Sequence, residues 1–134
     1  MSDQEIERIK AKKMEELKKS LSSNAKELKV YDFDEVKFNE FINKNKPVLI
    51  DFWAEWCAPC LIMKPILDEL AEDYGERVIF GRVNVDENQN LAIKYGINAI
   101  PTFILFLNGK PVERLVGAVG KKPLEKIIRK VSQG

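Results

Sequence analysis

The sequence predicts an α/β fold in which a central mixed β-sheet carries helices on both faces. Two observations lead to this prediction. From residue 28 onward, short apolar runs alternate with helical patterns, as in βαβ units. Near the end of the chain, the pair Asn108-Gly109 separates two apolar runs and predicts a hairpin of antiparallel strands. The expected element order is βαβαβαββα, with parallel and antiparallel strands in one sheet.

Length and composition are those of one globular domain. The chain has 134 residues, 45% of them hydrophobic, and a formal net charge of +1, so no basic surface for nucleic acid is predicted. It shows neither an apolar leader nor an apolar run long enough to cross a bilayer. We therefore expect a cytoplasmic protein with no membrane or nucleic-acid partner.

Residues 1–27 are expected to form an amphipathic helix and linker ahead of a domain that spans residues 28–134. The apolar positions of this helix share one face: Ile6, Ile9, Met14, Leu17 and Leu21. A serine-rich stretch at residues 20–24 then interrupts the pattern. The helix can pack on the domain, or it can dock onto a partner or a second copy. We expect a monomer, with weak dimerisation through this helix as the alternative.

The first elements of the domain are a strand, a helix and a second strand. Residues 28–31 form the first strand, and Asp34 caps a helix that carries apolar residues at four positions: Val36, Phe38, Phe41 and Ile42. Pro47 prevents the helix from continuing. Residues 48–53 are apolar except for Asp51, which is typical of a central strand covered on both faces.

A longer helix is expected over residues 57–74. Its inward side chains should be Ile62, Met63, Ile66, Leu67 and Leu70. Pro65 lies inside this helix, so we expect a kink there. Gly75 ends the helix, and residues 78–85 form the next apolar strand.

The last third of the chain supplies two helices and the hairpin. A short helix starts at residue 86 or 88 and ends at Gly96. The hairpin strands are residues 102–107 and 112–116. A final helix over residues 123–131 should bury one apolar face: Leu124, Ile127, Ile128 and Val131.

Cys57 and Cys60 are the only cysteines, and they lie where a strand gives way to a helix. This spacing in a βαβ context predicts a redox dithiol whose sulfurs can close and reopen a disulfide. A thiol at a helix N-terminus faces free N–H groups that stabilise its thiolate. Cys57 is therefore the expected nucleophile and Cys60 the resolving thiol. With no histidine in the chain, the ligands of a zinc site are lacking, and no metal is expected.

Residues 51–60 resemble the active-site signature of the thioredoxin family. Further segments stand at the spacings of that family: residues 65–70, 83–86, 95–97, 100–102, 108–109 and 116–118. The resemblance covers residues 28–134 and implies the thioredoxin fold. It implies a thiol-disulfide oxidoreductase that reduces protein disulfides, with Cys57 forming a mixed disulfide that Cys60 resolves. It also implies a thioredoxin reductase as partner, disulfide-containing proteins as substrates, and no bound cofactor.

The resemblance further assigns a substrate-docking rim around the dithiol. Pro101 matches the family's cis-proline, which faces the disulfide. The remaining rim positions are apolar or small and are expected to be exposed: Trp56, Ala58, Pro59, Ile100, Val116, Gly117 and Ala118.

Asp51 is the expected proton carrier. Burial in its strand would raise its pKa and suit it to take and return the Cys60 proton through water. The alternative is a strand-end aspartate that is hydrogen-bonded to the backbone. Arg82 stands where many family members have lysine, and we expect it to keep Asp51 more acidic than a lysine would. The alternative for Arg82 is a side chain that points to solvent.

Two further departures from the family pattern affect the dithiol and its rim. Ala58 replaces a common glycine, which stiffens the turn between the cysteines and is expected to alter the reduction potential. Leu61 replaces a common lysine or other polar residue, which removes a cation from the rim and adds apolar surface.

Two other functions compete with disulfide reduction. A disulfide oxidase or isomerase would use the same chemistry in the opposite direction, but such relatives usually have a histidine between the cysteines and a secretory signal. A binding or scaffold module of the same fold would instead act through its N-terminal helix. Deleting residues 1–26 distinguishes a reductase from such a module, because a reductase should keep its turnover on a generic protein disulfide.

Overall fold

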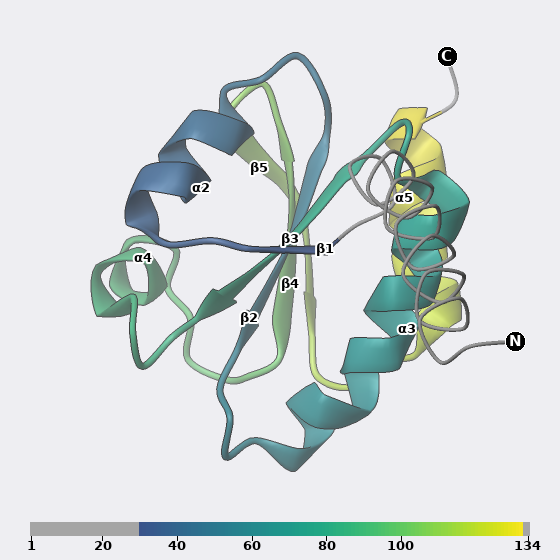
Figure 1. The fold of residues 1–134 in the computed structure, drawn as a ribbon. Coiled ribbons are helices and arrows are strands. Elements are labelled where there is room, and N and C mark those ends of the chain that lie inside the picture. Colours follow the sequence, from purple (N-terminus) through teal and green to yellow (C-terminus); the bar gives the residue numbers. More distant parts are fainter. Residues whose placement is uncertain (1–29, 133–134) are drawn as a thin grey trace, which may run out of the picture.

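The computed structural model describes residues 30–132, so the predicted helix and linker of residues 1–27 lie outside the described part of the chain. The described elements follow the expected order, with strands and helices alternating until a final strand pair and helix. Figure 1 shows a twisted central sheet with α3 and α5 on one face and α2 and α4 on the other. The predicted α/β class and mixed sheet are confirmed.

Five strands form the sheet: β1 (Val30–Asp32), β2 (Val48–Trp53), β3 (Ile79–Asn84), β4 (Thr102–Leu107) and β5 (Lys110–Val116). Their spatial order is β1-β3-β2-β4-β5. The first three strands in this order run parallel to one another, β4 pairs antiparallel with β2, and β5 pairs antiparallel with β4. β2 lies between β3 and β4, and the helices on the two faces of the sheet bury it on both sides, as its apolar run predicted.

Four helices cover the sheet: α2 (Glu35–Ile42), α3 (Ala58–Tyr74), α4 (Gln89–Lys94) and α5 (Lys121–Ser132). One buried cluster fills the space between the sheet and the pair α3 and α5, and a second fills the space toward α2 and α4. Within residues 30–132, no helix is long and apolar enough to cross a bilayer.

The sequence signals at helix ends and turns locate the elements well. The Asp34 carboxylate accepts a hydrogen bond from the Lys37 backbone N–H at 2.8 Å and so caps α2. Asn108 and Gly109 both have positive φ angles, 53° and 80°, as a two-residue hairpin of type I′ requires. The hairpin prediction is therefore confirmed.

The structure differs from expectation in the burial of one side chain and in the start of two elements, since β5 begins at Lys110 rather than at residue 112. The side chain of Ile62, predicted to face inward, is 62% exposed. Each helical residue turns by about 100°, so Ile62 points about 100° away from Met63, which faces the core. The last helix begins at Lys121 rather than at Pro123, because the first turn of a helix tolerates proline.

Candidate functional site

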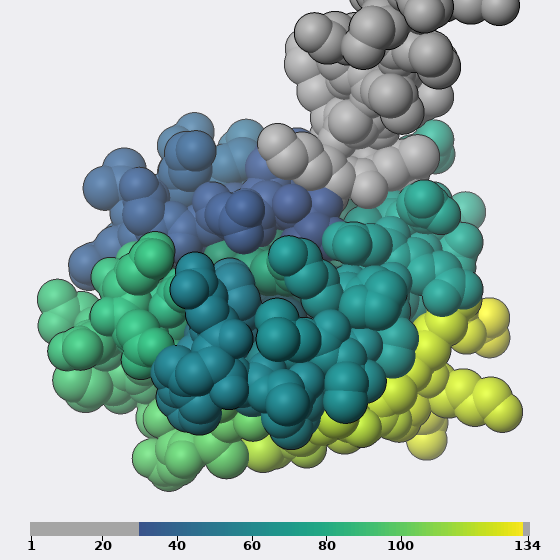
Figure 2. All heavy atoms as spheres, turned by 60° about the horizontal axis from the view of Figure 1, so that its bottom comes forward, coloured from purple at the N-terminus to yellow at the C-terminus, as the bar shows by residue number. Residues whose placement is uncertain are grey.

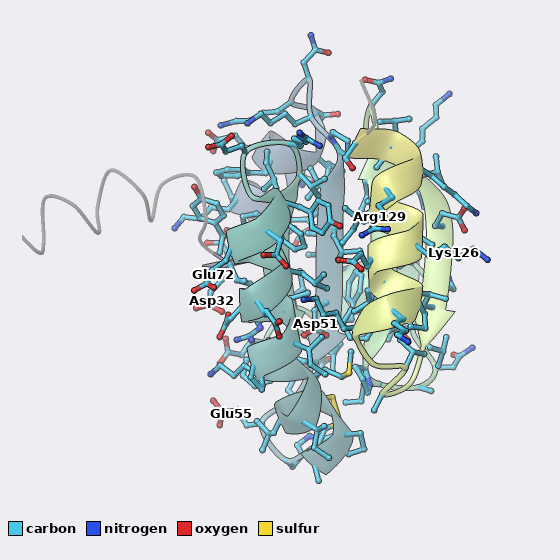
Figure 3. All side chains as sticks on the ribbon, turned by 90° about the vertical axis from the view of Figure 1, so that its right-hand side faces the viewer. Asp32, Asp51, Glu55, Glu72, Lys126 and Arg129 are labelled. Atoms are coloured by element: carbon cyan, nitrogen blue, oxygen red, sulfur yellow. A yellow bond between two sulfur atoms is a disulfide. The ribbon has the colours of Figure 1, made fainter. Side chains whose placement is uncertain are left out.

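The two cysteines lie where β2 leads into α3. Cys57 is the N-cap residue of α3, and its Sγ accepts a hydrogen bond from the Cys60 backbone N–H at 3.2 Å. The two residues form a disulfide with their Cα atoms 5.2 Å apart, at the N-terminal end of α3 (Figure 3). The pairing that the Cys-x-x-Cys spacing predicted is confirmed.

The surroundings of Cys57 favour negative charge on its sulfur. Sγ faces the free N–H groups and the positive dipole end of a 17-residue helix. Both cysteines are nearly covered and pack against Ala54, with Trp53, Val85 and Ile100 at the edge of this small cluster. The helix end and the bonded N–H stabilise a thiolate here, whereas the apolar neighbours oppose its charge.

Asp51 lies inside β2, opposite Arg82 on β3 and Phe103 on β4. Its side chain is 1% exposed and appears between α3 and α5 in Figure 3. Burial raises the pKa of Asp51 from 3.8 to about 7, and the positive charge of Arg82 opposes this rise. Its Oδ1 has no hydrogen-bond partner among the described residues, and Asp51 lies inside β2 rather than at its end, so the alternative of a strand-end aspartate is wrong.

Arg82 is buried beside Asp51 rather than turned to solvent. Its Nε lies 3.8 Å from Asp51 Oδ2, and its guanidinium carbon lies 5.8 Å from the centre of the Trp53 ring. The alternative of a solvent-pointing Arg82 is wrong. Its Nη2 donates no hydrogen bond to a described residue, and the side chain lines a polar hollow of about 550 Å³ that also receives Lys64. Water entering this hollow would meet the guanidinium.

The loop before β4 faces the disulfide. The Ile100–Pro101 peptide bond is cis, as expected, and the Ile100 carbonyl oxygen lies 3.8 Å from Cys57 Sγ. The backbone N–H of Gly117 donates to the Pro101 carbonyl at 2.7 Å. This bond holds the loop after β5 against the loop before β4, so two segments distant in sequence meet beside the dithiol.

The structure brings the predicted rim residues together around the cysteines. Trp56, Ala58, Pro59, Val116 and Ala118 are exposed, Ile100 and Gly117 are half-buried, and Pro101 is buried. In Figure 2 the blue-teal segment around the cysteines lies at the front, with the green residues of α4 on one side. Leu61 is 47% exposed, so the apolar surface continues onto α3.

Sequence reasoning missed two features of the rim. The Trp56 indole N–H donates to the Asp86 carboxylate at 2.8 Å, which holds the exposed ring in place. An apolar groove of about 370 Å³ also opens beside that ring. Its lining residues come largely from α4 and the following loop: Trp56, Val85, Gln89, Ala92, Ile93, Ile97, Asn98, Ala99 and Ile100. The Trp56–Asp86 bond could have been suggested only by the presence of an acid two residues after β3. No local pattern in the sequence indicates the groove.

Metal binding has no support in the described part of the chain. No group of three or more His, Cys, Asp or Glu side chains among residues 30–132 could hold a metal ion.

The Thioredoxin family model matches residues 29–130. The chain belongs to the thioredoxin family. Over 89 residues it is 45% identical to the thioredoxin of Chlorobaculum thiosulfatiphilum, covering 66% of this chain and 82% of that one. Over 99 residues it is 44% identical to the thioredoxin of Alicyclobacillus acidocaldarius, covering 74% and 94%. The structure of a mutant thioredoxin from Halobacterium salinarum superposes with a TM-score of 0.72 at 33% identity, covering 78% and 91%.

Membership in the thioredoxin family and the Cys57–Cys60 disulfide together establish the chemistry. The protein is a dithiol oxidoreductase that reduces protein disulfides. Its substrates contain disulfides, and the structure shows the oxidised form that remains after a substrate has been reduced.

Proposed function

We propose that Cys57 is the attacking thiolate of this reductase and Cys60 its resolving thiol. The observation that carries the assignment is the position of Cys57 Sγ at the N-cap of α3, where it accepts the Cys60 N–H. Cys60 lies one turn further into the helix, and the disulfide shows that its sulfur reaches Cys57.

The reaction then runs in two exchanges. Cys57 thiolate attacks one sulfur of the substrate disulfide, and the other substrate sulfur leaves as a thiolate that takes up a proton. Cys60, losing its proton, attacks Cys57 in the mixed disulfide and expels the second substrate sulfur. Two electrons pass to the substrate, and the Cys57–Cys60 disulfide remains. A thioredoxin reductase is the partner that returns these electrons.

Asp51 takes the proton that Cys60 loses, through water. Its pKa of about 7 means that near neutral pH it changes its protonation state readily in either direction. Arg82 is permanently charged and lies 3.8 Å away, so it limits the rise of the Asp51 pKa. Without that charge, Asp51 would hold its proton too tightly to serve as an acceptor.

The rim docks an extended substrate segment beside the dithiol. Exposed apolar side chains at Trp56, Pro59 and Val116 offer contact area without a pocket that selects one side chain. The loop containing Ile100 presents its backbone next to Cys57, where an extended chain can pair with it. The same rim serves substrates and the reductase in turn, because both must reach Cys57.

Trapping the mixed disulfide tests the two cysteine roles. With a generic protein disulfide as substrate, Cys60→Ser should accumulate an adduct joined through Cys57, which mass spectrometry detects. Cys57→Ser should form no adduct and show no turnover. An adduct through Cys60 in Cys57→Ser, as abundant as the one in Cys60→Ser, would reverse the assignment.

The domain boundary and the setting of the protein complete the proposal. Residues 28–134 carry the reductase, and the protein acts as a monomer in a reducing compartment such as the cytoplasm, where paired cysteines are usually catalytic rather than structural. Comparing the full chain with a chain lacking residues 1–26 tests this. Equal turnover on a generic protein disulfide supports it, and loss of turnover would show that the reductase needs residues 1–26.

A further inference from the structure

The segment between α4 and β4 presents its backbone to the dithiol. We call residues 96–101 the presenting loop. It carries the Ile100 carbonyl, whose oxygen lies 3.8 Å from Cys57 Sγ, and the cis peptide bond before Pro101. The loop belongs to no helix or strand, so contacts with other parts of the fold must fix where this carbonyl lies relative to the sulfur.

The end of the presenting loop is bonded to β4 and to the segment after β5. Thr102 Oγ1 donates a hydrogen bond to the Ala99 carbonyl at 2.5 Å, and the Gly117 N–H donates to the Pro101 carbonyl at 2.7 Å. Thr102 is 1% exposed, so water competes little for its bond. This end of the loop is therefore part of the rigid framework of the sheet.

The beginning of the presenting loop is bonded to Arg114. The guanidinium donates through Nη2 to the Tyr95 carbonyl and through Nη1 to the Gly96 carbonyl, whose oxygen lies 3.4 Å away. Both carbonyls follow the last turn of α4, where a helix leaves C=O groups without partners. A guanidinium is a planar fork that can reach two adjacent carbonyls in fixed geometry, whereas a lysine ends in one ammonium group on a flexible stem.

The place of Arg114 in β5 explains why its side chain reaches α4. Arg114 pairs with Ile104 of β4, whose side chain belongs to the buried cluster facing α2 and α4. Paired residues of antiparallel strands point to the same face of a sheet, so Arg114 also points to this face. Gly117, which bonds the end of the loop, lies three residues further along the chain. Residues 114–117 thus bond both ends of the presenting loop.

We propose that Arg114 is a positioning residue for the reduction of protein disulfides. By bonding the carbonyls at the beginning of the presenting loop, it keeps the Ile100 carbonyl beside Cys57, where an extended substrate chain pairs with the loop. Arg114 touches neither the sulfurs nor the substrate. The proposal rests on the proposed function, which gives this loop its role in docking. A disulfide too small to pair with the loop gains nothing from Arg114.

Two substrates separate the position of the loop from the chemistry of the dithiol. One is a protein disulfide, which must dock, and the other is a small aromatic disulfide that releases a chromogenic thiolate. Arg114→Met removes the guanidinium and keeps an unbranched apolar stem, and Arg114→Lys keeps the charge without the fork. Each full-length reduced variant is mixed with each substrate. Tryptophan fluorescence or the released thiolate then gives the second-order rate constant.

We expect Arg114→Met to lower the rate constant for the protein disulfide by about three- to tenfold, since Arg114 is exposed and water competes for its bonds. The rate constant for the small disulfide should stay unchanged, and Arg114→Lys should recover part of the loss. Arg129→Met is the matched control. It removes the same group on α5, on the other face of the sheet (Figures 1 and 3), where Arg129 bonds Tyr74 and pairs with Glu125. It should change neither rate constant.

The outcomes distinguish this inference from the function on which it rests. An equal loss with both substrates would overturn it, because Arg114 would then support the dithiol or the whole fold. An unchanged rate constant for the protein disulfide would overturn it too, as would an equal loss in Arg129→Met, which would make net charge the cause. If the wild-type protein reduces neither disulfide, the proposed roles of Cys57 and Cys60 fail, and the role of Arg114 fails with them.

Discussion

Replacing Asp51 with asparagine measures how much the buried, ionised carboxylate lowers the free energy of unfolding. The asparagine would keep the shape of the side chain and resemble the protonated acid, so the surroundings of Arg82 would match those of the wild-type protein at low pH. The variant therefore isolates the ionisation of one group. Asp51 is 1% exposed, so solvent screens its charge little.

The size of the effect follows from the pKa. Burial raises the pKa of Asp51 from 3.8 to about 7, and each pKa unit corresponds to about 1.4 kcal/mol. Ionised Asp51 thus destabilises the folded protein by about 4 kcal/mol. Between about pH 4 and pH 7 the folded protein holds this proton while the unfolded chain has lost it, so the wild-type free energy of unfolding falls as pH rises through this window.

Denaturant unfolding of the oxidised protein at a series of pH values provides the measurement. Asp51→Asn and wild type should be about equally stable near pH 4, and the variant should be more stable by about 4 kcal/mol above pH 8. Glu72→Gln, which removes an exposed carboxylate, should show no such pH-dependent difference. A difference between Asp51→Asn and wild type that stays constant from low to high pH would refute the reasoning.

Three further perturbations have defined outcomes. Arg82→Gln removes the charge that opposes the rise in the Asp51 pKa, so the midpoint of the Asp51 titration, followed by NMR, should move to higher pH. An unchanged midpoint would show that Arg82, whose Nε lies 3.8 Å from Asp51 Oδ2, does not affect the ionisation of Asp51. Gly81→Ala would place a Cβ against the Phe33 ring, closer than van der Waals contact allows, and overpacking of this kind should lower the free energy of unfolding by about 1 to 3 kcal/mol. A midpoint of denaturation like that of wild type would mean that the ring moves aside freely. Asp34→Ala removes the cap of α2 and should lower the free energy of unfolding by about 1 kcal/mol, whereas Asp34→Ser should keep most of the wild-type stability. Equal stability of the two variants would contradict the capping role.

Local signals in the sequence were enough to locate most of the fold. The Asn108-Gly109 turn is determined by two residues that tolerate positive φ, so no distant contact was needed to predict it. The strand of residues 102–107 is bounded by that turn and by Pro101, and its observed limits are the predicted ones. The burial of Asp51 also followed from its own strand, because a run that is apolar on both faces belongs at the centre of a sheet.

Contacts between distant segments could not be predicted in the same way. Trp56 and Asp86 are 30 residues apart and meet because β2 and β3 are neighbours in the sheet. The apolar groove beside Trp56 depends on where the six-residue helix α4 lies relative to the Trp56 ring, which no sequence periodicity encodes. Ile62 shows that hydrophobicity alone can also mislead, because an apolar side chain suggests burial while its angular position on α3 leaves it exposed.

The burial that destabilises the protein should also set the pH dependence of its reaction. Below about pH 7 Asp51 holds a proton and cannot accept the one that Cys60 loses. The resolution of a preformed mixed disulfide, followed in a single turnover, should therefore slow as pH falls through about 7, and Asp51→Asn should remove this inflection and stay slow above it.

Stability and rate should then change in opposite directions in one variant. Asp51→Asn is expected to unfold less readily above pH 7 and to resolve mixed disulfides more slowly, because the charge that destabilises the fold is the base that the second exchange needs. A structural role alone would make both properties fall together. If the variant is both less stable and slower, Asp51 supports the fold and another group takes the Cys60 proton.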